Sequence, residues 1–211
     1  MPDRLPARPE RADLPPEDHP TYDRVMERQA KLWANAPSNS DRYFGALLNS
    51  PQMAATIAEL GKFMRMGQVR GTYSDADREL VDMVLSVDFG YNAILALHIP
   101  DAIAVGVRLE AIEALWRGRE EGLDEGERQL THYIRQVAGG TVDDASFAAM
   151  VARQGARTVV EYTAFITFLV STMRLWQALG VPEPTDAEID ELLGAYRSGR
   201  GPVVDPAARV G

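Results

Sequence analysis

The sequence predicts an all-α fold. In most of the chain, apolar residues recur every three or four positions, and glycine or proline ends each run. The β-branched residues fall inside these helical periods, and turn residues do not occur at hairpin spacing. The longest apolar run, near 164–170, is far shorter than the roughly 20 residues that a membrane-spanning helix needs. We therefore expect helices throughout, and no membrane partner.

Composition excludes several classes of function. The 211 residues carry a formal net charge of −9, which disfavours nucleic acids and anionic membrane surfaces as partners. The absence of cysteine excludes disulfides, thiolate nucleophiles and thiol peroxidase chemistry. Because the N-terminal residues contain no apolar segment typical of a secretion signal, we expect a cytoplasmic protein.

Three parts are predicted along the chain. Residues 1–20 contain six prolines and mixed charges, so we expect an N-terminal arm without packed helices. Helical periods continue through 21–196, which we interpret as a single all-helical domain. Residues 197–211 contain glycine and proline without periodicity, and are expected to form a tail.

In the N-terminal half, the apolar spacing predicts helices near 21–34, 43–49 and 51–65, with a loop at 35–40. Pro51 suits the first position of the third helix, because a proline there removes no hydrogen bond.

The central stretch 74–118 has the densest helix signals. Ser74 is a good N-cap for a helix that reaches about residue 87 and ends at Asp88-Phe89-Gly90. A second helix is predicted from about Tyr91 to His98. Pro100 is expected to open another, and a last one covers 109–116.

The C-terminal half follows the same design, with helices predicted at 124–137, 144–151, 158–179 and 186–196. Residues 76–85 resemble 126–135, and 104–108 resemble 152–157, at offsets of about 50. Two helical hairpins around a pseudo-twofold axis would explain these matches. Chance similarity between amphipathic helices explains them equally well.

Glu79 and His98 are the leading candidates for chemistry. On one straight helix they would lie about 28 Å apart, so the break at 88–90 must fold the chain back for them to meet. A histidine after an apolar run is most simply a partly buried side chain bonded to a backbone carbonyl. The alternative is a general acid or base, oriented by the glutamate.

Other chemistries have little support in the sequence. The three histidines, His19, His98 and His132, form no pair at helical spacing, so we expect no metal site. No glycine-rich nucleotide loop and no nucleophile elbow for a serine hydrolase occur.

The helix predicted at 158–179 is apolar almost all round, which is typical of a buried helix, but one face carries Thr163, Thr167, Ser171 and Arg174. Their side chains either bond to backbone carbonyls and solvent, or form the polar wall of a pocket or subunit interface. Arg174 in an apolar setting would need an anion, either Glu161, Asp88 or a substrate carboxylate, and Arg65 is a second candidate for this role.

Around His98 the chain reads HIPDAIAVGVRLEAIEAL, and Glu79 precedes His98 by 19 residues. With the stretches that flank it, this pattern over about 43–181 resembles the carboxymuconolactone decarboxylase and alkylhydroperoxidase-D-like superfamily. The resemblance implies an all-helical subunit of that fold, which assembles into trimers or hexamers. The peroxidase branch has cysteines where this chain has Tyr91 and Ile94, so the resemblance is to the decarboxylase-like branch.

The resemblance implies a cofactor-independent lyase that acts on a small cyclic carboxylate or lactone. His98 would move a proton, Glu79 would orient the imidazole of His98, and Tyr91 would donate a hydrogen bond to a developing enolate. Arg174 or Arg65, with Thr167, would bind the substrate. An isomerase or cyclase with the same acid–base pair is one alternative. A non-catalytic oligomeric member that binds an apolar ligand or a partner is the other.

Overall fold

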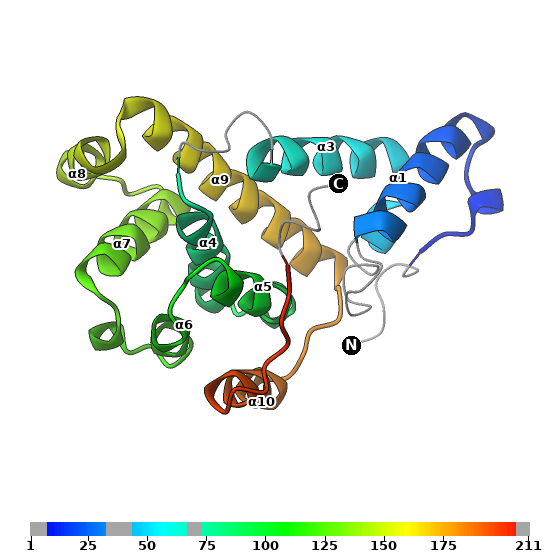
Figure 1. The fold of residues 1–211 in the computed structure, drawn as a ribbon. Helices are drawn as coiled ribbons and strands as arrows, with labels where there is room; N and C mark the ends of the chain where they lie inside the picture. The colour runs from blue at the N-terminus through cyan, green and yellow to red at the C-terminus, as the bar shows by residue number, and fades with distance from the viewer. Residues whose placement is uncertain (1–7, 33–43, 67–72, 206–211) are drawn as a thin grey trace. The chain divides into compact units, whose positions relative to one another are not determined.

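The computed structural model describes residues 8–32, 44–66 and 73–205. Within these ranges the chain is helical and contains no β-strand, so the predicted all-α class is confirmed (Figure 1). No helix in the described part is both long enough and apolar enough to span a membrane. The predicted loop at 35–40 lies outside the described residues.

The helices and their bounds are α1 (His19–Leu32), α3 (Pro51–Met66), α4 (Asp75–Asp88), α5 (Asn92–Ala104), α6 (Leu109–Trp116), α7 (Glu125–Gly139), α8 (Asp144–Gln154), α9 (Ala156–Leu179) and α10 (Asp186–Arg197). Short 3-10 helices occur at Arg11–Asp13, Pro16–Asp18 and Glu120–Gly122. Residues 44–47, within the helix predicted at 43–49, are also helical. Most predicted helices match these bounds to within two or three residues.

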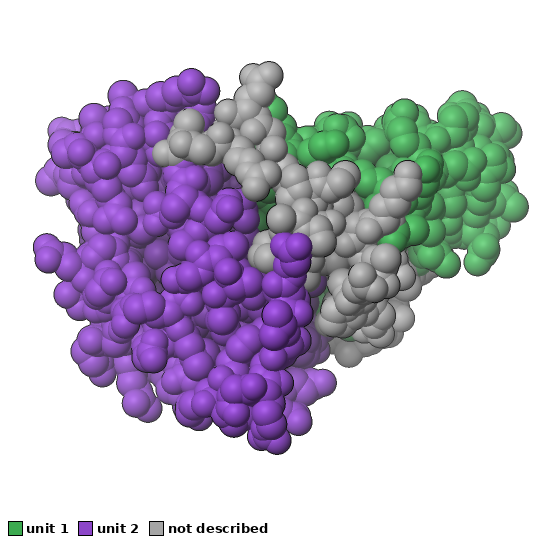
Figure 2. All heavy atoms as spheres, viewed as in Figure 1, with its two compact units in different colours: residues 1–68, 174–182, 207–211 green, residues 69–173, 183–206 purple. Residues whose placement is uncertain are grey.

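Contacts divide the chain into two compact units, although the sequence predicts one domain over 21–196 (Figure 2). The first unit comprises the described residues of 1–68 together with 174–182. The second comprises the described residues of 69–173 and 183–206. The first has a core of its own, which is formed by Tyr22, Val25, Leu47, Leu48 and Ala54.

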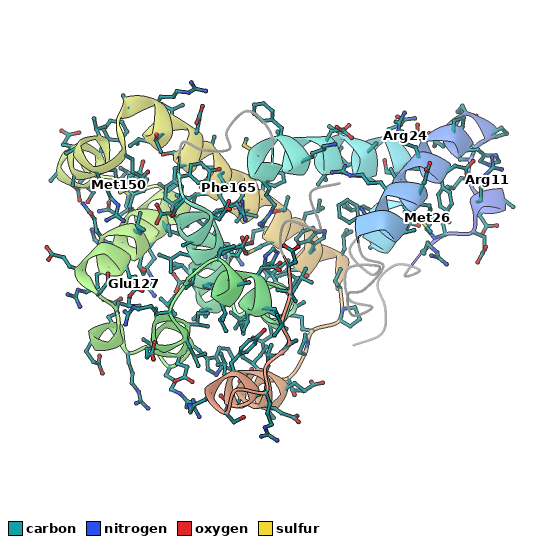
Figure 3. All side chains as sticks on the ribbon, in the orientation of Figure 1. Arg11, Arg24, Met26, Glu127, Met150 and Phe165 are labelled. Carbon is teal, nitrogen blue, oxygen red and sulfur yellow. The ribbon has the colours of Figure 1, made fainter. Side chains whose placement is uncertain are left out.

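The described residues of the N-terminal arm, 8–20, are more ordered than their proline content predicts. Arg11, labelled in Figure 3, donates two hydrogen bonds to Asp23 of α1, with a shortest distance of 2.8 Å. The Tyr22 hydroxyl donates to the Pro9 carbonyl at 3.1 Å. Proline fixes φ at a value that suits short 3-10 turns, so the prolines shape this segment rather than unfold it.

In the second unit, α4 packs against α5, α6 and α7 (Figure 1). Residues 79–86 of α4 are all buried, because neighbours cover more than one face of the helix. The Tyr162 hydroxyl of α9 donates to the Asp77 carbonyl at 2.9 Å, and Phe165 one turn later is fully buried (Figure 3).

The predicted ends of α4 are confirmed, whereas the prediction for α5 is wrong in one respect. The Ser74 hydroxyl accepts from the Asp77 N–H at 3.0 Å, and Gly90 adopts φ 60° in the turn after α4. However, Pro100 lies inside α5, which continues to Ala104 instead of ending at His98. The helix accommodates a proline that was expected to start a new one.

Two capping boxes support the predicted starts of α7 and α10. Asp124 and Thr185 accept from the backbone N–H three residues later, and Glu127 and Glu188 bond back to the N-cap N–H. The predicted correspondence between α4 and α7 stays a prediction.

The expectation of a buried helix at 158–179 is confirmed for one side of α9 and wrong for the other. Val160 of α9 is 66% exposed, and Thr167, Ser171 and Arg174 are exposed as well. Apolar content alone does not bury a helix, because burial also requires a neighbour on each face.

Candidate functional site

Glu79 and His98 meet. His98 Nδ1 lies 2.8 Å from Glu79 Oε2, and both side chains are buried. The turn around Gly90 reverses the chain, so that the first turns of α4 lie beside the middle of α5. The break at 88–90 therefore folds the chain back, as the predicted meeting of Glu79 and His98 requires.

Arg78 anchors the other side of Glu79. Its Nε donates to Glu79 Oε1 at 3.1 Å, and its guanidinium also donates to Asp75 Oδ1 at 2.6 Å. The two oxygens of Glu79 thus have different partners, a guanidinium and an imidazole. This arrangement fixes the orientation of the carboxylate and directs Oε2 towards the ring.

Two further carboxylates face the imidazole. Asp82 Oδ1 lies 3.8 Å from His98 Nε2, and Asp101 Oδ2 lies 3.9 Å from His98 Nδ1. The side chains of Glu79, Asp82 and Asp101 are 3%, 0% and 7% exposed, and that of His98 is 11% exposed. The imidazole of His98 therefore lies among three buried carboxylates.

Asp82 and Asp101 are missed by the analysis of the sequence, although a signal for them exists. Asp82 lies three residues after Glu79, and Asp101 lies three residues after His98. Side chains at this spacing share a helix face. Once Glu79 and His98 are assumed to meet, both aspartates are expected near them.

Tyr91 and Tyr196 lie in the surroundings of this cluster. Tyr91 is fully buried at the N-cap of α5, and seven residues of helix place it about 10 Å along the axis from His98. Tyr196 comes from α10, which packs against α5. Burial, with a smaller contribution from the charge of Asp101, raises the pKa of Tyr196 to about 12.

The three predicted substrate-binding residues have other surroundings. Arg174 is exposed and donates to Gln177 at 2.9 Å, so it does not have the apolar setting expected for it. The Thr167 hydroxyl donates to the Ala164 carbonyl at 2.9 Å. Of the two predicted roles for this residue, the structure thus shows the bond to a backbone carbonyl. Arg65 lies in the last turn of α3, and both arginines belong to the first unit.

The other two histidines do not join the cluster. His19 Nε2 lies 3.0 Å from the Leu14 carbonyl in the N-terminal segment. His132 is exposed on α7, which makes it a useful control for substitutions at His98.

Comparison with known proteins provides no assignment. The chain matches no protein-family model, none of the curated proteins and none of the solved structures. Inferences about function therefore depend on the cluster around His98.

Proposed function

We propose that the protein is an acid–base enzyme that moves a proton on a small substrate, and that His98 is the group that transfers it. The observation that carries the proposal is the 2.8 Å contact between Glu79 and His98 inside a buried cluster. A carboxylate that accepts from Nδ1–H leaves Nε2 as the base and stabilises the imidazolium that forms.

The roles follow from this geometry. Nε2 of His98 takes a proton from the substrate, and the imidazolium then lies between Glu79 and Asp82. The same group returns the proton to carbon, so no external oxidant or reductant is needed. In a decarboxylation, the departing carbon dioxide leaves an enolate, and His98 protonates its carbon. Tyr91 would donate only to a substrate that extends two turns along α5.

The charge of the cluster bears on the substrate class. Three carboxylates surround His98, and the neighbouring guanidinium of Arg78 is bonded to Glu79 and Asp75. An anionic substrate would be repelled here. Of the predicted substrates, a neutral lactone, on which His98 would move a proton without loss of carbon dioxide, therefore fits better than a carboxylate, which Arg174 or Arg65 would have to bind.

A second candidate is a non-catalytic protein that binds a small apolar ligand or a partner. The observation in its favour is that each ring nitrogen of His98 faces a buried carboxylate, which restricts the access of a substrate. An isomerase or cyclase would use the same proton transfer as the lyase.

The resemblance to the carboxymuconolactone decarboxylase and alkylhydroperoxidase-D-like superfamily supports the lyase chemistry. The 19-residue spacing of Glu79 and His98 agrees with it. Membership, the specific fold, assembly into trimers or hexamers and a cytoplasmic location are part of this proposal.

The test is turnover of a panel of small lactones and β-keto or vinylogous acids, measured by product formation. We expect His98→Ala and Glu79→Gln to lower kcat by at least about 100-fold, as for loss of a general base. His132→Ala should retain wild-type turnover. Equal turnover by His98→Ala and the wild type would contradict the proposal, and no turnover of any compound would favour the non-catalytic candidate.

A further inference from the structure

We propose that Glu79, His98 and Asp101 form a binding site for a divalent transition-metal ion of the Mn²⁺ or Zn²⁺ type. Each of the three residues offers one ligand atom, and these atoms lie within 4.8 Å of one another. The sequence predicts no metal site because it lacks paired histidines. This site instead uses one histidine with carboxylates from two helices, and it does not depend on the proposed catalysis.

The distances suit an ion with a small adjustment. His98 Nδ1 lies 2.8 Å from Glu79 Oε2 and 3.9 Å from Asp101 Oδ2. An ion about 2.1 Å from each donor can hold donors up to about 4.2 Å apart. Movement of a carboxylate by a few tenths of an ångström, as rotation of the Asp101 side chain allows, therefore completes the site.

The surroundings of the cluster resemble the outer shell of a metal site. A histidine that binds a metal commonly donates its other ring N–H to a carboxylate, and Asp82 lies on that side, 3.8 Å from Nε2. Arg78 donates to Glu79 Oε1. Because Arg78 occupies that oxygen, Glu79 Oε2 is directed towards the imidazole and can serve as the ligand.

The charges provide an independent argument. Glu79, Asp82 and Asp101 are buried carboxylates, and buried charges are costly unless they are compensated. A divalent cation between Glu79 and Asp101 would lower this cost for both, because each would bind it directly.

The donor set also indicates the kind of ion. One imidazole and two carboxylates, with no thiolate, suit Mn²⁺, Co²⁺ and Zn²⁺ better than ions that prefer sulfur. A cation at Nδ1 would displace the proton that Nδ1 shares with Glu79. The metal-bound form and the proton-transferring form of His98 therefore exclude each other.

The experiment is titration of the full chain, after treatment with a chelator, with Co²⁺ followed by visible absorption and with Mn²⁺ followed by electron paramagnetic resonance. We expect a single equivalent to bind. Asp101→Asn, which preserves the shape of the side chain, should weaken binding by more than tenfold. Asp82→Asn should weaken it by about 10- to 100-fold, as for loss of an outer-shell carboxylate.

Two control variants are matched to the cluster. Asp75→Asn removes a carboxylate that bonds to Arg78 but is outside the ligand set, and His132→Ala removes an exposed histidine. Both should bind Co²⁺ like the wild type, and circular dichroism checks that all variants are folded. Unchanged affinity in Asp101→Asn, or no binding by the wild type at millimolar Co²⁺, would overturn the proposal. Since no substrate is used, this outcome is independent of the turnover test.

Discussion

At the scale of single residues, the arrangement around Arg78 has consequences for stability. The Arg78 guanidinium bonds to the buried Glu79, and it also bonds to Asp75, whose side chain is 45% exposed. A buried ion pair is costly to break from one side, because the remaining charge stays in the interior. An exposed pair contributes little.

We therefore expect Arg78→Met to lower the free energy of unfolding by about 3 kcal/mol, because Glu79 loses its guanidinium. Arg78→Lys should recover part of this loss, since an ammonium restores the charge but not the planar geometry. Asp75→Asn should cost less than about 1 kcal/mol. Urea denaturation measures all three. Equal losses for Arg78→Met and Asp75→Asn would show that burial of Glu79 is not what makes the contact important.

At the scale of elements, α5 contains a residue that destabilises the helix in which it lies. Pro100 lies inside α5 and has no N–H to donate to the carbonyl four residues earlier. The turn that precedes this helix depends on Gly90, whose φ of 60° is strained for any residue with a Cβ atom. The two positions predict opposite effects of substitution by alanine.

Pro100→Ala should raise the free energy of unfolding by about 1 kcal/mol or more, because it supplies the missing donor in a helix interior. Gly90→Ala should lower it by about 1 kcal/mol. A Cβ atom at Gly90 would meet nothing within 4 Å, so this cost comes from the backbone alone. Thermal denaturation of the two variants tests the signs, and stabilisation by both would contradict the assignment of strain to Gly90.

Helix α9 provides a prediction about alkaline pH. Burial is the main cause that raises the pKa of Tyr162 well above 10.0, and its hydroxyl donates to the Asp77 carbonyl. The folded state therefore keeps the phenolic proton at a pH where the unfolded chain loses it. The contribution of Tyr162 to stability is complete below about pH 10 and decreases as the pH rises further.

Tyr162→Phe should lower the free energy of unfolding by about 1 kcal/mol at neutral pH, because it removes the hydrogen bond to the Asp77 carbonyl. Above about pH 10, its stability should decrease less steeply than that of the wild type. Denaturant unfolding at a series of pH values measures both effects. Parallel pH profiles for the two proteins would contradict the role of the buried phenol.

At the scale of the whole molecule, each of the two units is stabilised by its own buried residues. Leu48 is 1% exposed in the core of the first unit, and Leu85 of α4 is fully buried in the second. Truncation of a buried side chain in one core should therefore increase local opening mainly in the helices that pack around that side chain.

Leu48→Ala and Leu85→Ala should each cost about 2–5 kcal/mol, as for truncation of a buried leucine. Hydrogen exchange measured by mass spectrometry should become faster in α1 and α3 for Leu48→Ala. For Leu85→Ala, the change should be largest in α4, α5 and α7. The same pattern of exchange in both variants would show that the units open as one cooperative structure.

The sequence by itself determined the helical class, most helix bounds and the break that places Glu79 beside His98. These features depend on local signals: apolar periodicity, the cap at Ser74, and Gly90 in the turn. Such signals act over a few residues and can be read without knowledge of the neighbours. The same local rules also produced the error at Pro100, where packing keeps the helix intact.

Only the tertiary structure decided which charges surround His98 and which faces of α9 are covered. Asp82 and Asp101 converge on the imidazole because α4 and α5 pack side by side, and Arg174 is exposed although its helix is rich in apolar residues. Burial and the meeting of distant side chains depend on how helices pack, which periodicity does not specify. For this reason, the pair Glu79 and His98 could be predicted, whereas Asp82 and Asp101 could be expected beside it only once the two helices were known to pack together.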